Sequence, residues 1–402
     1  MAKRKELAPI KSPPGNIYAH IVGWGMSVPE SRLTNDDLEA ILNTSDEWIQ
    51  SRTGIKERRI ASERESTVTL GFKAAKEALE VTDILPSEID LIIVATSTPE
   101  SVFPSTASLI QNWLGANNAG AFDLSAACSG FVYGVNMATQ AIRSGSIRTA
   151  VVIGSETMTR VMDWQDRATC ILFGDGAGAV VIQASEAEGG VLSSVMRSDG
   201  SGYDLLGLPS PGSRDNSGYR KPNKMFMQGG EVFKFATRVI GESITEATIL
   251  AGIKLDDIKL VVPHQANDRI IHAAARSLNL DKNLFMTNLA HYGNTSAASI
   301  PIALCEAVNT GKINPDDHIV LVGFGGGLAW GALVIKWGIP KSQDRPGSRF
   351  TRQRRQAGYT LVGVRARLRH WGRRITDIIS RIRPNYGRLY RLRHKIDQFD
   401  FD

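Results

Sequence analysis

Cysteine is scarce in this chain, and long apolar runs are missing. The only cysteines among the 402 residues are Cys128, Cys170 and Cys305, which lie far apart and are odd in number. This pattern disfavours a disulfide framework and predicts a reducing, cytoplasmic setting. No Cys/His spacing typical of a zinc site is present, so we expect no metal site. Because neither a secretory signal nor a run of about eighteen apolar residues occurs, we expect a soluble protein.

The net charge of +6 conceals opposite charges in two parts of the chain. Residues 341–402 contain 17 Lys/Arg and 5 Asp/Glu, whereas residues 1–340 contain 30 Lys/Arg and 36 Asp/Glu. An acidic body is therefore joined to a basic tail, and the two parts need separate explanations.

Short, β-branched and almost wholly apolar runs recur through the body, as is typical of strands buried on both faces. Helical stretches lie between them, for example at 231–252 and 269–280. This alternation predicts an α/β fold in which helices cover the sheets. The predicted strands are LIIVATS (91–97), TAVVIGSE (149–156), GAVVIQA (178–184), KLVVPHQ (259–265), HIVLVGFGGG (318–327) and GALVIKW (331–337).

One order of elements occurs twice. Residues 90–156 and 258–327 each read as strand, helix, turn, helix and strand, with about 36 residues from the strand start to the turn. The repetition predicts two similar halves that contribute turns to one shared site. In this alignment Cys128 corresponds to the neighbourhood of Asn294, and both lie near the start of a predicted helix.

Cys128 lies in DLSAACSGF (123–131), among small residues and before a predicted helix. Unpaired N–H groups and the positive end of the helix dipole favour a thiolate there, and the thiolate is the form that attacks carbonyl carbons. Cys170 and Cys305 lie inside apolar runs, where a cysteine is typical of packing. The surroundings of Cys128 therefore predict a nucleophile.

Two further segments offer partners for a nucleophile. His264 follows a predicted strand in VPHQAN, and Asn294 precedes a predicted helix in HYGNTSAAS. An imidazole and an amide can each donate a hydrogen bond to an oxygen that gains negative charge, as in an enolate. A protease-like Cys/His/Asn set uses the same residue types and is an alternative. Each residue alone is also typical of a structural histidine or a helix cap.

Glycine supplies the third element. GFGGGLAWGA (323–332) places three consecutive glycines directly after a predicted strand, where the backbone can approach a ligand closely. Its N–H groups can join that of Cys128 around the oxyanion of a tetrahedral intermediate. A dinucleotide-binding loop is the alternative, but no complete GxGxxG pattern opens a helix there. FGDGAGAVV (173–181) is interpreted as a structural tight turn between strands.

Together these segments resemble the β-ketoacyl-acyl carrier protein synthases of type III, which are thiolase-like condensing enzymes. The resemblance extends from about Ile17 to Gly338. It implies a layered αβαβα fold built from two similar halves, residues 17–185 and 186–340, after an N-terminal arm of residues 1–16. The matching motifs are TNDDLEAILNTSDEWIQSRTGIKERRIA, FPSTASLIQNWLGA, AFDLSAACSGFVYG, FGDGAGA, VPHQANDRII, HYGNTSAAS and GFGGGLAWGA.

The resemblance implies a reaction that initiates fatty-acid synthesis. Cys128 would take an acyl group from a short acyl-CoA primer, and malonyl-acyl carrier protein would then enter. His264 and Asn294 would stabilise the enolate formed by decarboxylation, whose carbon attacks the Cys128 thioester to give 3-oxoacyl-acyl carrier protein. Decarboxylation supplies the carbanion without a strong base, so neutral donors suffice. The N–H groups of Cys128 and Gly326 would form the oxyanion hole.

Further positions carry over from the family as binding residues. Trp48, Arg52 and Arg167 match contacts to the adenine and phosphates of coenzyme A, for which stacking and charge are suited. Asn267 matches a residue beside the pantetheine arm. Arg269 matches a basic position that would meet an acidic carrier protein.

The resemblance also implies a homodimer and no tightly bound cofactor. Phe103, in ESVFPS, matches a loop that family dimers insert beside the partner's acyl pocket. Acyl-CoA and malonyl-acyl carrier protein would be substrates.

Two alternatives accompany this prediction. Plant-type polyketide synthases share the Cys/His/Asn set, so a related enzyme of secondary metabolism that condenses or transfers other acyl groups is the first. A non-catalytic thiolase-like scaffold is the second. The intact set of Cys128, His264, Asn294 and Gly326 disfavours the scaffold.

The family pattern ends after Pro340, and a linker and basic tail follow over 341–402. Apolar residues from Leu361 to Ile382 are spaced three and four apart, with arginines mostly between them, which predicts a basic amphipathic helix over 360–383. Such a helix suits peripheral contact with an anionic membrane or with a protein such as the carrier protein. Docking on the body is the alternative, and few aromatics among the arginines disfavour nucleic acid.

Overall fold

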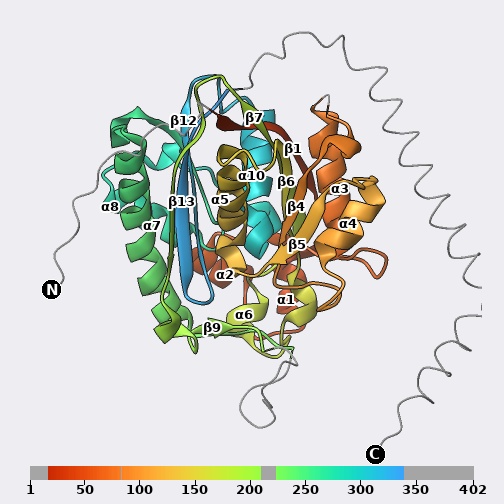
Figure 1. Ribbon diagram of the computed structural model, residues 1–402. Helices are drawn as coiled ribbons and strands as arrows, with labels where there is room; N and C mark the ends of the chain where they lie inside the picture. The colour runs from red at the N-terminus through yellow and green to blue at the C-terminus, as the bar shows by residue number, and fades with distance from the viewer. Residues whose placement is uncertain (1–16, 83, 210–222, 339–402) are drawn as a thin grey trace, which may run out of the picture.

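The computed structural model describes residues 17–82, 84–209 and 223–338 (Figure 1). The predicted arm at 1–16 and the predicted tail helix at 360–383 therefore lie outside the described residues. Within the described residues, no helix combines the length and the hydrophobicity needed to cross a membrane.

Two sheets carry the fold. The first is five-stranded in the order β1-β7-β6-β4-β5, and the second is four-stranded in the order β11-β12-β13-β8. Their strands are β1 (Tyr18–Ser27), β4 (Leu91–Ala95), β5 (Gly120–Leu124), β6 (Thr149–Thr157), β7 (Asp175–Ser185), β8 (Gly190–Ser198), β11 (Ile258–Pro263), β12 (His318–Gly325) and β13 (Ala329–Lys336).

The two sheets have the same pairing pattern. In the first, β4 pairs with β6 in parallel, and β6, β7 and β1 are antiparallel neighbours. In the second, β11 pairs with β12 in parallel, and β12, β13 and β8 are antiparallel neighbours. In the first sheet, β5 pairs in parallel with β4 at the edge. In the second sheet, a single parallel bridge from Val261 on β11 to Phe285 takes the corresponding position.

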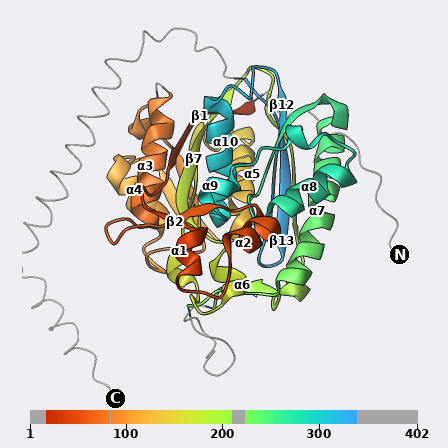
Figure 2. The ribbon, with the colours of Figure 1, turned by 180° about the vertical axis from the view of Figure 1, so that it is seen from behind.

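Helices lie between the sheets and on both outer faces (Figures 1 and 2). The helices α5 and α10 pack between the two sheets in one apolar core that includes Val132, Val135, Ile300 and Leu304. A second core joins α3 and α4 to the first sheet, and a third joins α7 and α8 to the second. The long helices are α3 (Thr67–Glu80), α4 (Thr106–Leu114), α5 (Gly130–Arg143), α7 (Gly229–Ala251), α8 (Asp268–Ser277) and α10 (Ser299–Asn309).

Local sequence explains where several helices begin and end. Ser66 caps α3 with a capping box to Thr69, and Asn267 caps α8 through its side chain. Gly252 ends α7 with φ of 72°, a conformation that glycine adopts without strain. The smaller elements are α1 (Asn35–Glu39), α2 (Asp46–Thr53), α6 (Arg167–Cys170), α9 (Leu289–Tyr292), β2 (Arg32–Thr34), β3 (Glu57–Arg59), β9 (Leu206–Gly207) and β10 (Phe226–Met227).

The α/β prediction is confirmed, and all six predicted strands are present. The tight turn predicted for 173–181 is wrong, because Asp175–Ser185 is one continuous strand, β7. Its glycines serve helix packing: a Cβ on Gly178 would lie 2.7 Å from Pro301 Cβ and 2.8 Å from Ile302 N in α10. Strands β1, β5 and β8 were not predicted, since glycine, polar or charged residues interrupt their apolar pattern.

Candidate active site

A cavity of about 340 Å³ is lined by residues from segments that follow strands of both sheets. Cys128, His264 and Asn294 all line it, although 136 residues separate the first from the second in the sequence. The structure therefore brings the three predicted residues together. Gly326 and the predicted binding residues Trp48, Arg52 and Asn267 line the same cavity.

Cys128 lies in a short 3-10 turn, η3 (Ala127–Ser129), directly before α5. The preceding Ala127 has φ of 45°, which directs the chain sharply into the helix. Strand β12 passes so close that a Cβ on Gly325 would lie 2.7 Å from Cys128 N. This close approach requires glycine, and it fixes the turn that carries the sulfur.

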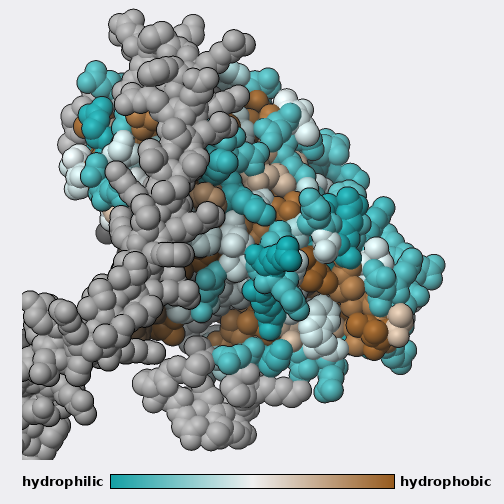
Figure 3. All heavy atoms as spheres, turned by 90° about the vertical axis from the view of Figure 1, so that its right-hand side faces the viewer, coloured by the Kyte–Doolittle hydropathy of each residue, from teal (hydrophilic) through white to brown (hydrophobic). Residues whose placement is uncertain are grey.

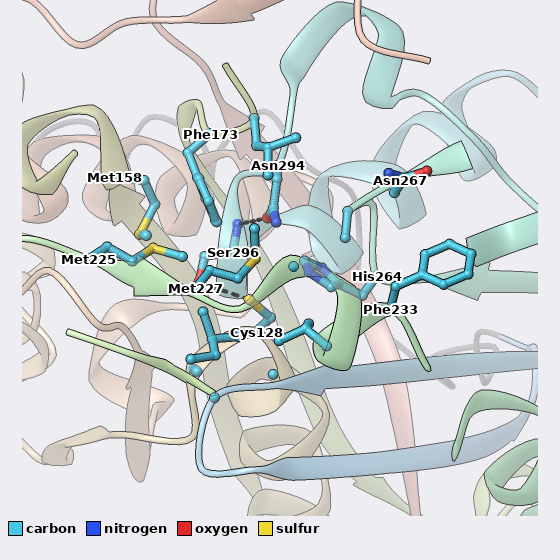
Figure 4. Close-up of a pocket in the computed structure, with 18 of the residues that line it drawn as sticks. Cys128, Met158, Phe173, Met225, Met227, Phe233, His264, Asn267, Asn294 and Ser296 are labelled. Carbon is cyan, nitrogen blue, oxygen red and sulfur yellow. Dashed lines mark hydrogen bonds between the residues drawn. The ribbon is translucent and has the colours of Figure 1, made fainter. Parts of the chain in front are cut away.

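The Cys128 side chain is 7% exposed, and its Sγ–H donates to Ser296 Oγ at 3.5 Å (Figure 4). Burial raises the pKa of the Cys128 thiol to about 12, and the Glu156 carboxylate adds to the rise. The hydrogen bond with Ser296 acts in the opposite direction. Burial therefore opposes the thiolate predicted from the helix start, and the resting group is a thiol.

His264 follows β11, and its backbone N–H donates to Val322 O of β12 at 2.8 Å. The imidazole is buried, with its ring centroid 5.1 Å from that of Phe324 in an edge-to-face arrangement. Ring atom Nδ1 lies 2.6 Å from Ser299 Oγ at the start of α10. Burial lowers the pKa of His264 to about 3, so the ring is neutral at physiological pH.

Asn294 is held by its backbone and by its side chain. Its N–H donates to Leu172 O at 2.8 Å, and its C=O accepts from Gly174 N–H at 3.0 Å. The side-chain Oδ1 accepts from Ser296 N–H at 2.8 Å. Because Oδ1 is occupied, the amide presents Nδ2 as a donor.

Hydrogen bonds in the described structure pair Cys128 with Ser296 and His264 with Ser299. A protease-like set requires a hydrogen bond from the thiol to the imidazole. The observed pairing therefore disfavours the protease-like interpretation.

The cavity has two chemically different ends, with Cys128 between them (Figure 4). One end is buried and formed by apolar side chains, which include Met158, Phe173 and Met225. Toward the other end lie Phe233 and Asn267, which are half-buried. An apolar group attached to Cys128 fits the first end, and a polar carrier arm fits the second.

Trp48, Arg52 and Arg167 come together from α2 and α6. The Arg167 guanidinium carbon lies 4.9 Å from the Trp48 ring centroid, and that of Arg52 lies 5.9 Å from it. Two cations and one indole thus form a cluster suited to an aromatic ring with phosphates.

The other predicted residues are placed differently. Asn267 caps α8 and also donates from Nδ2 to Arg52 O at 2.9 Å, so its amide joins two wall segments. Arg269, exposed at the start of α8, lies 5.3 Å from the Phe233 ring centroid. Phe103 does not line the cavity and is 84% exposed. Cys170 and Cys305 are fully buried, as predicted.

Sequence reasoning missed three polar residues behind the site: Glu156, Ser296 and Ser299. Ser296 stands two residues after Asn294, so a turn at that motif was a signal. A second signal was Glu156, a charged residue at the end of the apolar run TAVVIGSE. Across the described ranges, no group of three or more His, Cys, Asp or Glu is placed to hold a metal ion.

Two family models match parts of the chain. A family model described as 3-Oxoacyl-[acyl-carrier-protein (ACP)] synthase III matches residues 122–200, which contain Cys128. A second, described as the C-terminal part of 3-Oxoacyl-[acyl-carrier-protein (ACP)] synthase III, matches residues 250–337, which contain His264 and Asn294.

Individual proteins match over most of the chain. The β-ketoacyl-[acyl-carrier-protein] synthase III of Clostridium acetobutylicum is 49% identical over 321 residues, covering 79% of this chain and 98% of the relative. The crystal structure of 3-oxoacyl-[acyl-carrier-protein] synthase III from Aquifex aeolicus has 48% identity and a TM-score of 0.75, covering 79% of this chain and 100% of that one. The priming β-ketosynthase of the R1128 polyketide pathway has 33% identity and a TM-score of 0.74, covering 84% and 100%.

Proposed function

The chain belongs to the 3-oxoacyl-[acyl-carrier-protein] synthase III family, and on that premise we propose which residues perform its reaction. It is an acyltransferase of the thiolase-like condensing enzymes and initiates fatty-acid synthesis. The observation that carries the assignment of residues is the convergence of Cys128, His264 and Asn294 on one cavity.

Cys128 is the acyl acceptor. Its sulfur attacks the thioester carbon of an acyl-CoA primer, and coenzyme A leaves while the acyl group stays on Cys128. The apolar end of the cavity, beside Met158, Phe173 and Met225, receives the acyl chain. This step uses no metal or organic cofactor.

His264 and Asn294 stabilise the enolate that malonyl-acyl carrier protein forms on losing carbon dioxide. Ser299 Oγ accepts from Gln265 N–H at 3.4 Å and lies 2.6 Å from Nδ1 of His264, and in this proposal its hydroxyl donates to Nδ1. The neutral ring then carries its own proton on Nε2, which donates to the enolate oxygen. Asn294 Nδ2 is the second donor, and the enolate carbon attacks the Cys128 thioester.

The backbone N–H groups of Cys128 and Gly326 form the oxyanion hole for the tetrahedral intermediate. The support is the close packing of β12 against η3, together with Gly326 in the cavity wall. Backbone donors held this rigidly need no reorganisation as charge develops.

Coenzyme A and the carrier arm enter beside Asn267 and the Trp48 cluster. Trp48 stacks with the adenine, and Arg52 and Arg167 bind phosphates. Arg269, at the exposed start of α8, attracts an acidic acyl carrier protein.

The enzyme is a homodimer in this proposal. β5 is an edge strand of the first sheet, and Phe122 on it is 41% exposed. Val102 and Phe103, in the segment between β4 and α4, are 81% and 84% exposed. Figure 3, which faces the α3 and α4 side, shows apolar residues gathered in groups among polar ones. Pairing of two such faces would cover these side chains.

Two earlier predictions also stand as proposals. The segments 17–185 and 186–340 are equivalent halves, supported by the shared strand order of the two sheets. The cytoplasmic location rests on the scarcity of cysteine.

The test is incubation of the full chain with labelled acetyl-CoA, followed by malonyl-acyl carrier protein. We expect a covalent label on the wild-type protein, none on Cys128→Ala, and release as 3-oxoacyl-acyl carrier protein. A label that survives in Cys128→Ala would overturn the assignment. Competition among acyl-CoA primers in the same assay would report primer preference.

The alternative in secondary metabolism has one supporting observation, the match to the R1128 priming synthase. That match is 33% identical, against 48% for the Aquifex structure. The primer competition separates the two, because turnover with acetyl-CoA and malonyl-acyl carrier protein favours fatty-acid initiation. A scaffold role predicts no label at all.

A further inference from the structure

Glu156 is a buried carboxyl group directly behind the nucleophile, and the mechanism above does not use it. It lies at the end of β6 and is 0% exposed. Its Oε1 accepts from Ser296 Oγ–H at 2.9 Å, and Ser296 Oγ in turn accepts from Cys128 Sγ–H at 3.5 Å. A continuous chain of hydrogen bonds thus joins the reacting sulfur to a carboxylate.

The remaining contacts of Glu156 favour the carboxylate as its resting form. Thr98 Oγ1 and Thr96 Oγ1 lie 2.6 and 3.2 Å from Oε2, and Ser97 N–H donates to both oxygens at 3.1 Å. Each threonine hydroxyl already accepts a backbone N–H, from Thr157 and Thr98 respectively, so its own proton is available to Glu156. A protonated carboxyl group is a poorer acceptor for these hydrogen bonds, whereas a carboxylate can accept all of them.

The geometry points to Glu156 as a positioning residue that orients Ser296 and receives the Cys128 proton through it. On acylation, the S–H bond of Cys128 breaks and its proton passes to Ser296 Oγ, while the Ser296 proton passes to Glu156 Oε1. The sulfur bonds to the primer carbonyl carbon, and the C–S bond to coenzyme A breaks. The proton then returns through Ser296 and leaves with the coenzyme A thiol. This inference rests on the proposed function for the identity of the primer.

Charge explains why such a route suits this site. Burial and, to a smaller extent, the Glu156 carboxylate raise the pKa of Cys128, so a thiolate beside an ionised Glu156 is disfavoured for two reasons. Internal transfer moves one buried negative charge from Glu156 to the sulfur and adds none. Burial also raises the pKa of Glu156, which makes it a better acceptor.

The groups around Glu156 add no competing proton acceptor. On the segment after β4 and on η8 (Ser296–Ala298), its partners are hydroxyls and a backbone N–H. Of the titratable groups nearby, Cys128 on η3 interacts electrostatically with Glu156, Asp175 lies on β7, the strand paired with β6, and His264 follows β11. Asp175 accepts hydrogen bonds from Thr159 and Ala61, and His264 is paired with Ser299. Neither residue is therefore part of the hydrogen-bond chain from Cys128 to Glu156.

The test is the rate of Cys128 alkylation by iodoacetamide against pH, read by mass spectrometry, with Cys128→Ala as background for the other cysteines. When the proton moves from Cys128 to Glu156, the two residues together still hold one proton, as they do in the resting state. The population of the thiolate formed in this way is therefore independent of pH. We therefore expect wild-type alkylation to show a plateau around neutral pH. Glu156→Gln should lose the plateau, so its rate falls about tenfold per pH unit toward acid.

Ser296→Ala keeps the N–H that bonds Asn294 and removes the hydroxyl. We expect it to lose the plateau like Glu156→Gln, and the double variant to add little because the two act in series. Glu156→Asp should restore part of the plateau. Asp175→Asn, which removes a different buried carboxylate, should keep it.

A purely structural role predicts a different outcome, a rate lowered by the same factor at every pH. That result, or a plateau that survives in Glu156→Gln, would overturn the inference. Recovery of the wild-type rate by Glu156→Gln at high pH would show that the variant is folded. Failure of the proposed function is distinguishable, because it appears as a wild-type protein that is alkylated with a plateau but takes no label from acetyl-CoA.

Discussion

Replacement of Gly325 by alanine tests how the site is held together. Gly325 ends β12, and an added Cβ would lie 2.7 Å from Cys128 N, 3.1 Å from Cys128 Cβ and 3.2 Å from Ala127 Cβ. All three contacts are closer than ordinary van der Waals distance, and all three atoms are fixed by the backbone, so none can move away by a side-chain rotation. The turn η3 must therefore shift away from β12.

The expected cost has two parts. Overpacking of this kind destabilises a fold by about 1–3 kcal/mol. A displacement of about 1 Å at the reacting atom lowers rates by about 100-fold, because Cys128 leaves its alignment with Ser296 and the oxyanion donors. We expect Gly325→Ala to show both effects, with the loss of acylation rate the larger.

The assay combines urea unfolding with the rate at which acetyl-CoA labels Cys128. Gly230→Ala, in the first turn of α7, is the matched control, because its added Cβ has no atom within 4 Å. It should acylate at the wild-type rate. Wild-type acylation and stability in Gly325→Ala would refute the claim that the contact between β12 and η3 positions the nucleophile.

Three other predictions use the same protein. The pKa of His264 is about 3 in the folded protein and about 6.5 in an unfolded chain, so the unfolded state binds the proton more tightly. The free energy of unfolding therefore falls as the pH drops from 6.5 toward 3, by at most about 1.4 kcal/mol per pH unit. Urea unfolding of His264→Gln should show a weaker dependence of this free energy on pH, and the same dependence in both proteins would contradict the reasoning. Asn294→Asp exchanges the Nδ2 donor for a carboxylate oxygen, so condensation should fall by about 100-fold or more while Cys128 acylation continues, as measured by separate turnover and labelling assays. Phe122→Lys places a charge on the edge strand β5, so sedimentation should detect monomer where the wild type is dimeric, and an unchanged dimer would reject this interface.

Local sequence was enough for the α/β class and for the central strands. Runs such as LIIVATS and HIVLVGFGGG are apolar on both faces, so their burial follows from composition alone. The outer strands β1, β5 and β8 escaped because each contains glycine or exposed polar residues, and their pairing depends on partners far away in the chain. The local sequence does not explain Gly178, because this position needs glycine for close packing against α10, a helix more than a hundred residues later in the chain.

Short motifs also identified Cys128, His264 and Asn294 as candidates, since reactive residue types at strand ends and helix starts are visible in sequence. The sequence does not separate them from the alternative roles, because it contains no distances between side chains. Phe103 and the tail at 360–383 remain predictions.

The sequence by itself determined which residues can do chemistry: one cysteine among small residues, a histidine, an asparagine and a run of glycines, in an order that identifies the family. Only the tertiary structure decided their state. Desolvation favours the thiol form of Cys128 and the neutral ring of His264, and the packing of β6 against η8 places Glu156 behind Ser296. Burial and through-space contact depend on residues far apart in the sequence, and so no single segment of the chain encodes them.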